Sequence, residues 1–247
     1  MCRILLISGS PSRDEKKIIL SAFHFQAKIG MIPKGDLPGH KDGWGFCAYK
    51  NKRIVLCEKN YTDATTDQNF QKTTQKIADN DLDIIIGHLR KSAVGKVSFN
   101  NTHPFIFLDN SFCHNGILNN SQKLPIKILN EQITGETDSE HLFFYLLENI
   151  KPEDDFTEKF KLLLEEIRKT YDYTALNCLF SNGTQTIALR DVNLANKEVI
   201  DLNLLEYYTL YTGTSNDGRF TLVASEKIEL PNIKWRLMQN REFLIFN

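Results

Sequence analysis

The chain has 247 residues, 41% of them hydrophobic, and a formal net charge of −1. This length suits one large domain or two small ones, and its positive charges form no basic stripe, which argues against nucleic acid as a partner. The five cysteines are scattered without a CxxC pair. We therefore expect neither a disulfide framework nor a metal site, and we interpret all but Cys2 as ordinary free thiols.

Apolar segments long enough for targeting or membrane insertion do not stand out in the sequence. Arg3–Ser8 is too short to be the core of a signal peptide, and the later run Leu142–Leu147 is too short to span a bilayer. The sequence is therefore expected to belong to a cytoplasmic protein that does not bind membranes.

The first half of the chain is predicted to mix strands, two pairs of which form hairpins, with helices. In order, the elements are a strand at Arg3–Ser8, a helix at Asp14–Ile29, strands at Trp44–Tyr49 and Arg53–Glu58, a helix at Gln68–Ala78, and strands at Asp83–Leu89, Phe105–Leu108 and Ser111–His114.

The second half is predicted to begin with helices and to end with strands. In order, these are helices at Leu124–Glu131, from the capping-box pattern Thr137–Glu140 onward and at Asp154–Lys169, then strands at Tyr173–Phe180, Thr184–Arg190, Glu206–Thr212, Phe220–Ser225 and Glu242–Phe246. Strands and helices do not alternate regularly, which favours an α+β fold with mostly antiparallel sheets. No linker or repeat is evident, so we expect one domain covering residues 2–247.

Cys2 is the first candidate catalytic residue. If the initiator Met1 is removed, Cys2 carries both a thiol and a free α-amine, whose ordinary pKa values are about 8.5 and about 8. A single residue then supplies a nucleophile and a base that titrates near neutral pH. The alternative is that Cys2 is simply a small apolar residue at the start of a strand.

Three further motifs contain polar residues at strand or helix ends. Arg90, which ends Gly87–Arg90, could clamp a substrate carboxylate with two parallel hydrogen bonds, or it could lie in a surface ion pair. Asn115 and Gly116 could supply two donors to an oxyanion, or they could form a turn. Asp138 could hold a substrate ammonium group, or it could merely cap a helix.

The ordered set of motifs resembles the glutaminase domain of class II glutamine amidotransferases, which are N-terminal-nucleophile hydrolases. It is most similar to their short, free-standing branch, which resembles the γ-glutamyl-cleaving enzymes of thiol metabolism. The matching segments are Met1-Cys2, His40–Gly45, His88–Arg90, Asn101–Phe105, His114–Gly116 and Gly135–Glu140.

This resemblance implies a four-layer αββα sandwich of two mostly antiparallel sheets. It also implies that Cys2 is the nucleophile and its amine the base, and that Asn115 and Gly116 form the oxyanion hole. Arg90 and Asp138 would bind the substrate carboxylate and ammonium group. The sequence itself places His103 as a supporting residue of the substrate site, because a single His before Pro is more often structural than catalytic. No cofactor or metal is expected.

The implied reaction is cleavage of the γ-amide of glutamine or of a γ-glutamyl compound through a γ-glutamyl thioester, with ammonia released or passed to a separate partner protein. The large synthases of the class carry Thr and His where Ala93 and Val94 stand here. One alternative is a conventional Cys–His enzyme that pairs Cys113 with His88 or His103. The other is a catalytically inactive domain that binds γ-glutamyl metabolites or a partner subunit.

Overall fold

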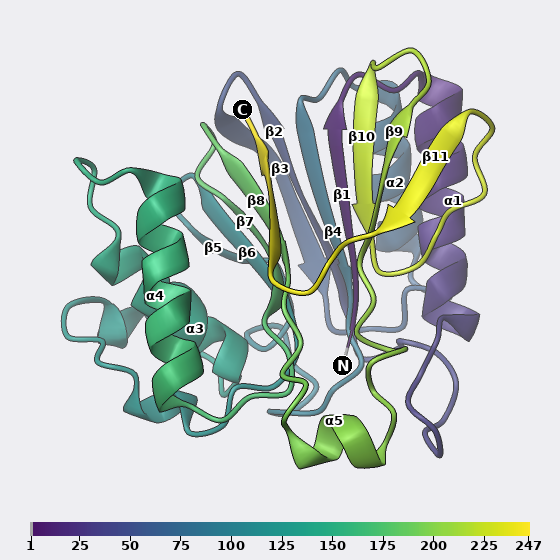
Figure 1. Ribbon diagram of the computed structural model, residues 1–247. Coiled ribbons are helices and arrows are strands. Elements are labelled where there is room, and N and C mark those ends of the chain that lie inside the picture. The colour runs from purple at the N-terminus through teal and green to yellow at the C-terminus, as the bar shows by residue number, and fades with distance from the viewer. Residues whose placement is uncertain (1) are drawn as a thin grey trace.

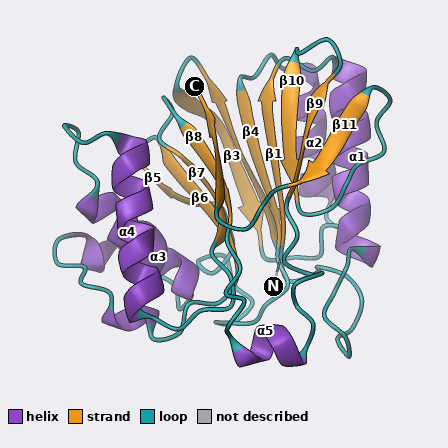
Figure 2. Ribbon diagram, in the orientation of Figure 1, coloured by secondary structure: helices purple, strands orange, loops and turns teal. Residues whose placement is uncertain are grey.

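Two antiparallel sheets lie face to face, and helices cover their outer faces (Figures 1 and 2). This computed structural model describes residues 2–247, so the expected removal of Met1 concerns a residue outside the described part. The arrangement confirms the four-layer αββα sandwich that the resemblance implied. Among the described residues, no helix is long and apolar enough to cross a membrane.

The larger sheet has seven strands, and β1 lies in its middle. The strand order is β11 (Ile233–Leu237), β9 (Tyr211–Ser215), β10 (Phe220–Ala224), β1 (Arg3–Gly9), β4 (Ile84–Leu89), β2 (Trp44–Lys50) and β3 (Arg53–Asn60). Its outer face packs against α1 (Arg13–Ile29) and α2 (Gln68–Asp79).

The smaller sheet has five strands, in the order β12 (Glu242–Phe246), β8 (Thr186–Arg190), β7 (Asn177–Ser181), β6 (Asn110–Asn115) and β5 (Phe105–Phe107). Helices α3 (Asp138–Asn149) and α4 (Phe156–Thr170) cover its outer face, and the short α5 (Lys197–Asp201) lies near the N-terminal end of the chain (Figure 1).

The alternation of side chains along β1 directs Cys2 into the space between the sheets. Leu5 and Ile7 belong to the apolar layer beneath α1 and α2, whereas Ile4 and Leu6 belong to the layer between the sheets. Successive residues of a strand point to opposite faces, so Cys2 shares the inward face of Ile4. The thiol thus lies at one end of the inter-sheet layer.

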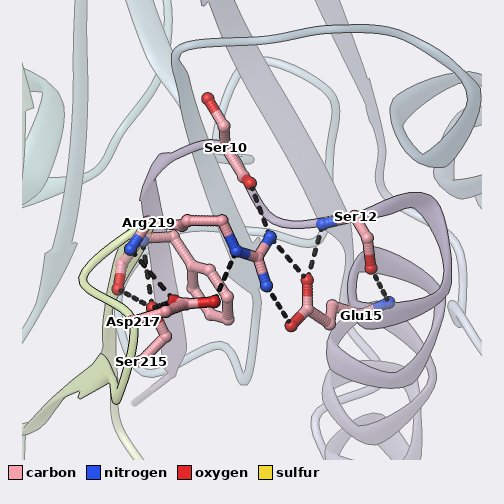
Figure 3. Close-up of polar contacts among 7 residues, drawn as sticks. Ser10, Ser12, Glu15, Ser215, Asp217 and Arg219 are labelled. Carbon is pink, nitrogen blue, oxygen red and sulfur yellow. Dashed lines mark hydrogen bonds and ion pairs between the residues drawn. The ribbon is translucent and has the colours of Figure 1, made fainter.

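The opposite end of β1 is fixed by a network around Arg219 (Figure 3). The guanidinium of Arg219 lies 2.8 Å from a carboxylate oxygen of Glu15 and 2.6 Å from one of Asp217, and it also donates to the carbonyl of Ser10. Gly9 has φ +103°, and a Cβ there would lie 2.4 Å from the Arg219 carbonyl oxygen. This network joins the start of α1 to the turn between β9 and β10, far from Cys2.

The helix predicted at Leu124–Glu131 is wrong. Two short 3-10 turns, Ser121–Lys123 and Leu129–Gln132, flank an irregular segment there. Pro125 cannot donate a helical hydrogen bond, and the Glu148 carboxylate accepts the backbone N–H groups of residues 127, 128 and 129 at 2.7–2.9 Å. A side chain from α3 therefore replaces the helical bonds.

The C-terminal third also differs from the prediction in places. Residues 206–210 lie outside any strand, and the strand predicted at Glu206–Thr212 is shifted to Tyr211–Ser215. The prediction missed β11 and α5 altogether. Strand β11 reads Ile-Lys-Trp-Arg-Leu, and this apolar–polar alternation is the pattern of a half-buried strand, so the signal was present and was overlooked.

Candidate active site

Cys2 lies at the start of β1 and is held on several sides. Its backbone N–H donates to Asn115 Oδ1 at 2.8 Å, and its carbonyl oxygen accepts from the Tyr207 hydroxyl at 3.1 Å. The Sγ atom lies 3.8 Å from the carbonyl oxygen of Lys91. With only 7% of its surface exposed, Cys2 has a fixed backbone and a thiol that faces a confined space.

The thiol of Cys2 is strongly acidic. Burial by itself raises the pKa, but the positive charge of the amino terminus and the neighbouring His88 outweigh it and lower the pKa from 9.0 to about 5. Burial raises the pKa of the Cys113 thiol well above its ordinary value. Because the thiolate is the nucleophilic form, this contrast favours Cys2 over a nucleophilic Cys113.

Asn115 is the last residue of β6, and its side-chain oxygen has a hydrogen-bond partner whereas its side-chain nitrogen has none. Its Oδ1 accepts the N–H of Cys2, whereas its Nδ2 is buried and has no hydrogen-bond partner among the described residues. A buried donor without a partner is costly, and functional sites are where such donors are found. At the next residue, Gly116, a Cβ would lie 1.8 Å from the carbonyl oxygen of Ala175. Only glycine fits there.

Arg90 directly follows β4, and its side chain points inward, because the residue is only 3% exposed. The guanidinium donates to the carbonyl oxygens of Val94, Gly95 and Lys96 at 3.0–3.3 Å, and to Ser92 Oγ at 3.2 Å. Arg90 is therefore not part of a surface ion pair. Its buried guanidinium instead holds the segment 92–96 in place through these hydrogen bonds.

Side chains from three other motifs fix the same segment. Asp42 Oδ2 accepts the Ser92 N–H at 2.7 Å, and Asn101 Nδ2 donates to the Lys96 carbonyl at 3.0 Å. The Glu136 carboxylate accepts the Lys96 N–H at 3.1 Å, while the Glu136 N–H donates to Asn101 Oδ1 at 2.7 Å. Motifs that are far apart in the sequence thus meet at the segment 92–96.

Asp138 is the first residue of α3, and the helix cap is its neighbour Thr137, whose hydroxyl accepts the Glu140 N–H at 3.2 Å. Asp138 Oδ2 accepts the N–H of Leu118 at 2.7 Å. The predicted capping box is only half formed, since the Glu140 carboxylate accepts from the N–H of Gly135 and of residue 134. A cap is therefore not the role of Asp138.

His103 stacks on His88, with ring centroids 4.1 Å apart and an angle of 28° between the rings. Both residues are buried, and none of their four ring nitrogens has a hydrogen-bond partner among the described residues. Burial, followed by the positive charges around it, lowers the pKa of His103 well below 6.5. The His103 ring is accordingly neutral at physiological pH.

One small pocket, with a volume of about 20 Å³, joins these residues. Its lining includes Cys2, Arg90, His103, Gly116 and Asp138, five of the six residues predicted from the sequence. The sixth, Asn115, is hydrogen-bonded to Cys2. The pocket also includes Ala93 and Val94.

A second cluster, on the other side of Cys2, was not predicted. Arg3 is fully buried, donates to His40 Nε2 at 3.3 Å and lies 3.5 Å from a carboxylate oxygen of Glu226. Its guanidinium also stacks on the Tyr207 ring at 4.1 Å. Burial and the Arg3 charge lower the pKa of His40 to about 2, so His40 is a neutral acceptor. The cluster packs behind the residue whose hydroxyl fixes Cys2.

Comparison with known proteins places these observations in a family. Residues 16–247 match the family model for class II glutamine amidotransferases, a range that begins after Cys2. An uncharacterised protein of Methanocaldococcus jannaschii is 34% identical over 225 residues, which cover 84% of this chain and 61% of that protein. The probable glutamine amidotransferase DUG3 of Saccharomyces cerevisiae is 29% identical over 61% of this chain and 46% of its own length. The chain thus matches about half of these relatives.

Solved structures share the fold at low sequence identity. The class II domain protein of Silicibacter pomeroyi superposes with a TM-score of 0.62 at 18% identity, over 99% of this chain and 94% of its own. The glutamine phosphoribosylpyrophosphate amidotransferase of Bacillus subtilis gives a TM-score of 0.66 at 18% identity, over the whole of this chain and 47% of its own.

Proposed function

The chain belongs to the class II glutamine amidotransferase family, and we propose that it cleaves the γ-amide of glutamine or of a related γ-glutamyl compound with Cys2 as nucleophile. The observation that carries this proposal is the hydrogen bond from the Cys2 N–H to Asn115 Oδ1, beside the unpartnered Asn115 Nδ2. It puts a thiol of lowered pKa next to a donor that has no other partner.

In the proposed first step, the Cys2 thiolate attacks the γ-carbonyl carbon. Negative charge develops on the carbonyl oxygen, and Asn115 Nδ2 and the Gly116 N–H donate to it. The α-amine of Cys2, freed by removal of Met1, protonates the nitrogen that leaves. The products of this step are a γ-glutamyl thioester on Cys2 and free ammonia or an amine.

Substrate binding is assigned to Arg90 and Asp138, which line the same pocket as Cys2. Arg90 would pair with the α-carboxylate and Asp138 with the α-ammonium group. At about 20 Å³ the pocket is large enough for about one water molecule. Substrate therefore enters only when the segment 92–96, which Arg90 holds by its carbonyl oxygens, moves aside.

In the second step, water hydrolyses the thioester and releases glutamate. A separate protein that accepts the ammonia would act on the first product and leaves this step unchanged. Addition of such a partner would change the fate of the nitrogen but not the yield of glutamate per amide cleaved.

The test is a panel of γ-glutamyl amides that includes glutamine and γ-glutamyl peptides, incubated with protein whose Met1 has been removed. Glutamate release is the readout, and Cys2→Ala is the inactive control. We expect at least one amide to be cleaved by the parent and none by the variant. A protein that binds these amides but releases no glutamate would instead be the catalytically inactive binding domain.

A further inference from the structure

The stacked pair His88 and His103 has no assigned role in the first step beyond the effect of His88 on the acidity of the Cys2 thiol. Cys2, Asn115, Gly116, Arg90 and Asp138 account for the nucleophile, the oxyanion donors and the substrate charges. The two imidazoles lie at 0% and 4% exposure, and all four of their ring nitrogens lack a partner among residues 2–247. Burying polar groups without a partner is costly, so a pair of them next to a nucleophile suggests that they have a function.

Their position is set by the framework of the larger sheet. His88 lies directly opposite Ile4 in the β1–β4 register, and Ile4 faces the inter-sheet layer, as Cys2 does. His88 is also one of the groups that lower the pKa of the Cys2 thiol. His103 lines the Cys2 pocket itself. The stacked rings therefore lie beside the sulfur.

The size of the pocket and the kind of group around it fit one small polar molecule. A buried water needs roughly 10–15 Å³ and two to four polar partners, and the pocket volume is about 20 Å³. Of the unpartnered buried nitrogens, those of His103 belong to a residue that lines this pocket. His88 stacks on His103, and Asn115, whose Nδ2 is also unpartnered, is hydrogen-bonded to Cys2. The neutral imidazole of His103 can both donate and accept a hydrogen bond, which is what orienting a water requires.

We propose that His88 and His103 are positioning residues that hold the water which resolves the Cys2 thioester. This inference rests on the thioester of the proposed function. The water oxygen forms a bond to the acyl carbon and the carbon–sulfur bond breaks. The water proton passes to the Cys2 amine and then to the departing thiolate, so glutamate and the free thiol result and the histidines keep their own protons.

The experiment separates the two steps in single-turnover kinetics of His103→Phe, which keeps a stacking ring but removes both nitrogens. Release of the amine should remain close to the parental rate, with a γ-glutamyl adduct accumulating on Cys2 by intact mass. Steady-state turnover should fall about 100-fold, the cost of a misplaced reactant. His24→Phe is the matched control, because His24 also stacks on a ring, that of Phe70, away from Cys2.

Rescue by hydroxylamine distinguishes a role in positioning water from a purely structural role. It attacks the thioester without needing the positioned water, forms a carbon–nitrogen bond as the carbon–sulfur bond breaks, and yields the γ-glutamyl hydroxamate. Turnover of His103→Phe should therefore recover with hydroxylamine, and His103→Gln, which keeps a polar atom, should accumulate less adduct.

Three results would overturn the inference: equal slowing of both steps, a rise in KM with an unchanged kcat, or no recovery with hydroxylamine. If His103→Phe does not fold, the same three measurements are made on His88→Gln at a pH well above the pKa of its Cys2 thiol, because His88 also lowers that pKa. Failure of the proposed function itself is distinguishable, because the parent enzyme would then release no amine from any substrate.

Discussion

The backbone N–H of Cys2 and the side-chain oxygen of Asn115 are joined by a 2.8 Å hydrogen bond that links the residue just before β1 to the last residue of β6. One bond thereby connects the two sheets at the end of the sandwich where the pocket lies. Because the amide oxygen is engaged, the amide nitrogen is directed elsewhere and remains unpartnered. The bond thus fixes which face of Asn115 is free to act on a substrate.

Asn115→Ala removes this donor. Loss of one oxyanion donor typically lowers kcat by a factor of about 100 to 1,000, and we expect a fall in that range with little change in KM. The variant deletes an unpartnered buried donor, but it also deletes the acceptor of the Cys2 N–H, so its melting temperature should fall modestly. Asn149→Ala is the control, because the Asn149 side chain donates to the Tyr145 carbonyl within α3. An Asn115→Ala enzyme with nearly full kcat would rule out the oxyanion role.

The acidity of Cys2 predicts the pH dependence of its alkylation. A thiol reacts as the thiolate, which predominates above its pKa, and the pKa of Cys2 is lowered to about 5. The rate of reaction with iodoacetamide should therefore rise through about pH 5 and level off above it. Mass mapping identifies the labelled residue, and Cys2→Ala should lose the label. A midpoint near the ordinary 9.0 would show that the amino terminus and His88 do not act on the thiol.

Arg90→Lys tests recognition of the substrate carboxylate. Lysine keeps the charge but lacks the planar fork that forms two parallel hydrogen bonds, and bonds to charged groups contribute about 1.5–3 kcal/mol. KM should rise roughly ten- to a hundred-fold. Arg219→Lys, in the remote network of Figure 3, should leave KM unchanged. If kcat fell and KM did not move, Arg90 would serve to arrange the segment 92–96 rather than to bind substrate.

Tyr207→Phe removes the hydroxyl that fixes the Cys2 carbonyl oxygen at 3.1 Å and keeps the ring on which Arg3 stacks. A single neutral hydrogen bond is worth about 1 kcal/mol, which corresponds to a roughly five-fold lower kcat if it positions the nucleophile. Steady-state kinetics with the preferred amide gives the measurement. An unchanged kcat together with a lower melting temperature would assign Tyr207 to stability alone.

Much of the fold was predictable because local sequence patterns, such as turn residues and apolar spacing, indicate its elements. The turn Asn51-Lys52 has both residues at positive φ and joins β2 to β3 where the hairpin was predicted. Helix α4 carries its apolar stripe at the expected spacing. The helix prediction for residues 124–131 was wrong because the backbone N–H groups there bond to the side chain of Glu148, which belongs to α3. A contact across twenty residues leaves no local pattern in the sequence.

The site residues also divide into those that a local motif indicates and those that depend on contacts between distant parts of the sequence. Cys2, Arg90 and Asn115 lie at strand ends, where a motif can mark them. The cluster of Arg3 and Tyr207 depends on a contact between residues 204 positions apart, and Tyr207 falls in a segment wrongly predicted to be a strand. His88 carried a detectable signal. It lies in β4 two residues before Arg90, which directly follows the strand, and this spacing favours both side chains on the same face.

The central claim, that Cys2 attacks a γ-glutamyl carbonyl, is tested most directly by a glutamine-analogue electrophile followed by mass mapping of the adduct. The protein must first be shown by intact mass to lack Met1. We expect one adduct per chain on Cys2, its formation prevented by excess substrate, with glutamate release lost in parallel. An adduct on Cys113, or glutamate release that survives complete modification of Cys2, would contradict the account.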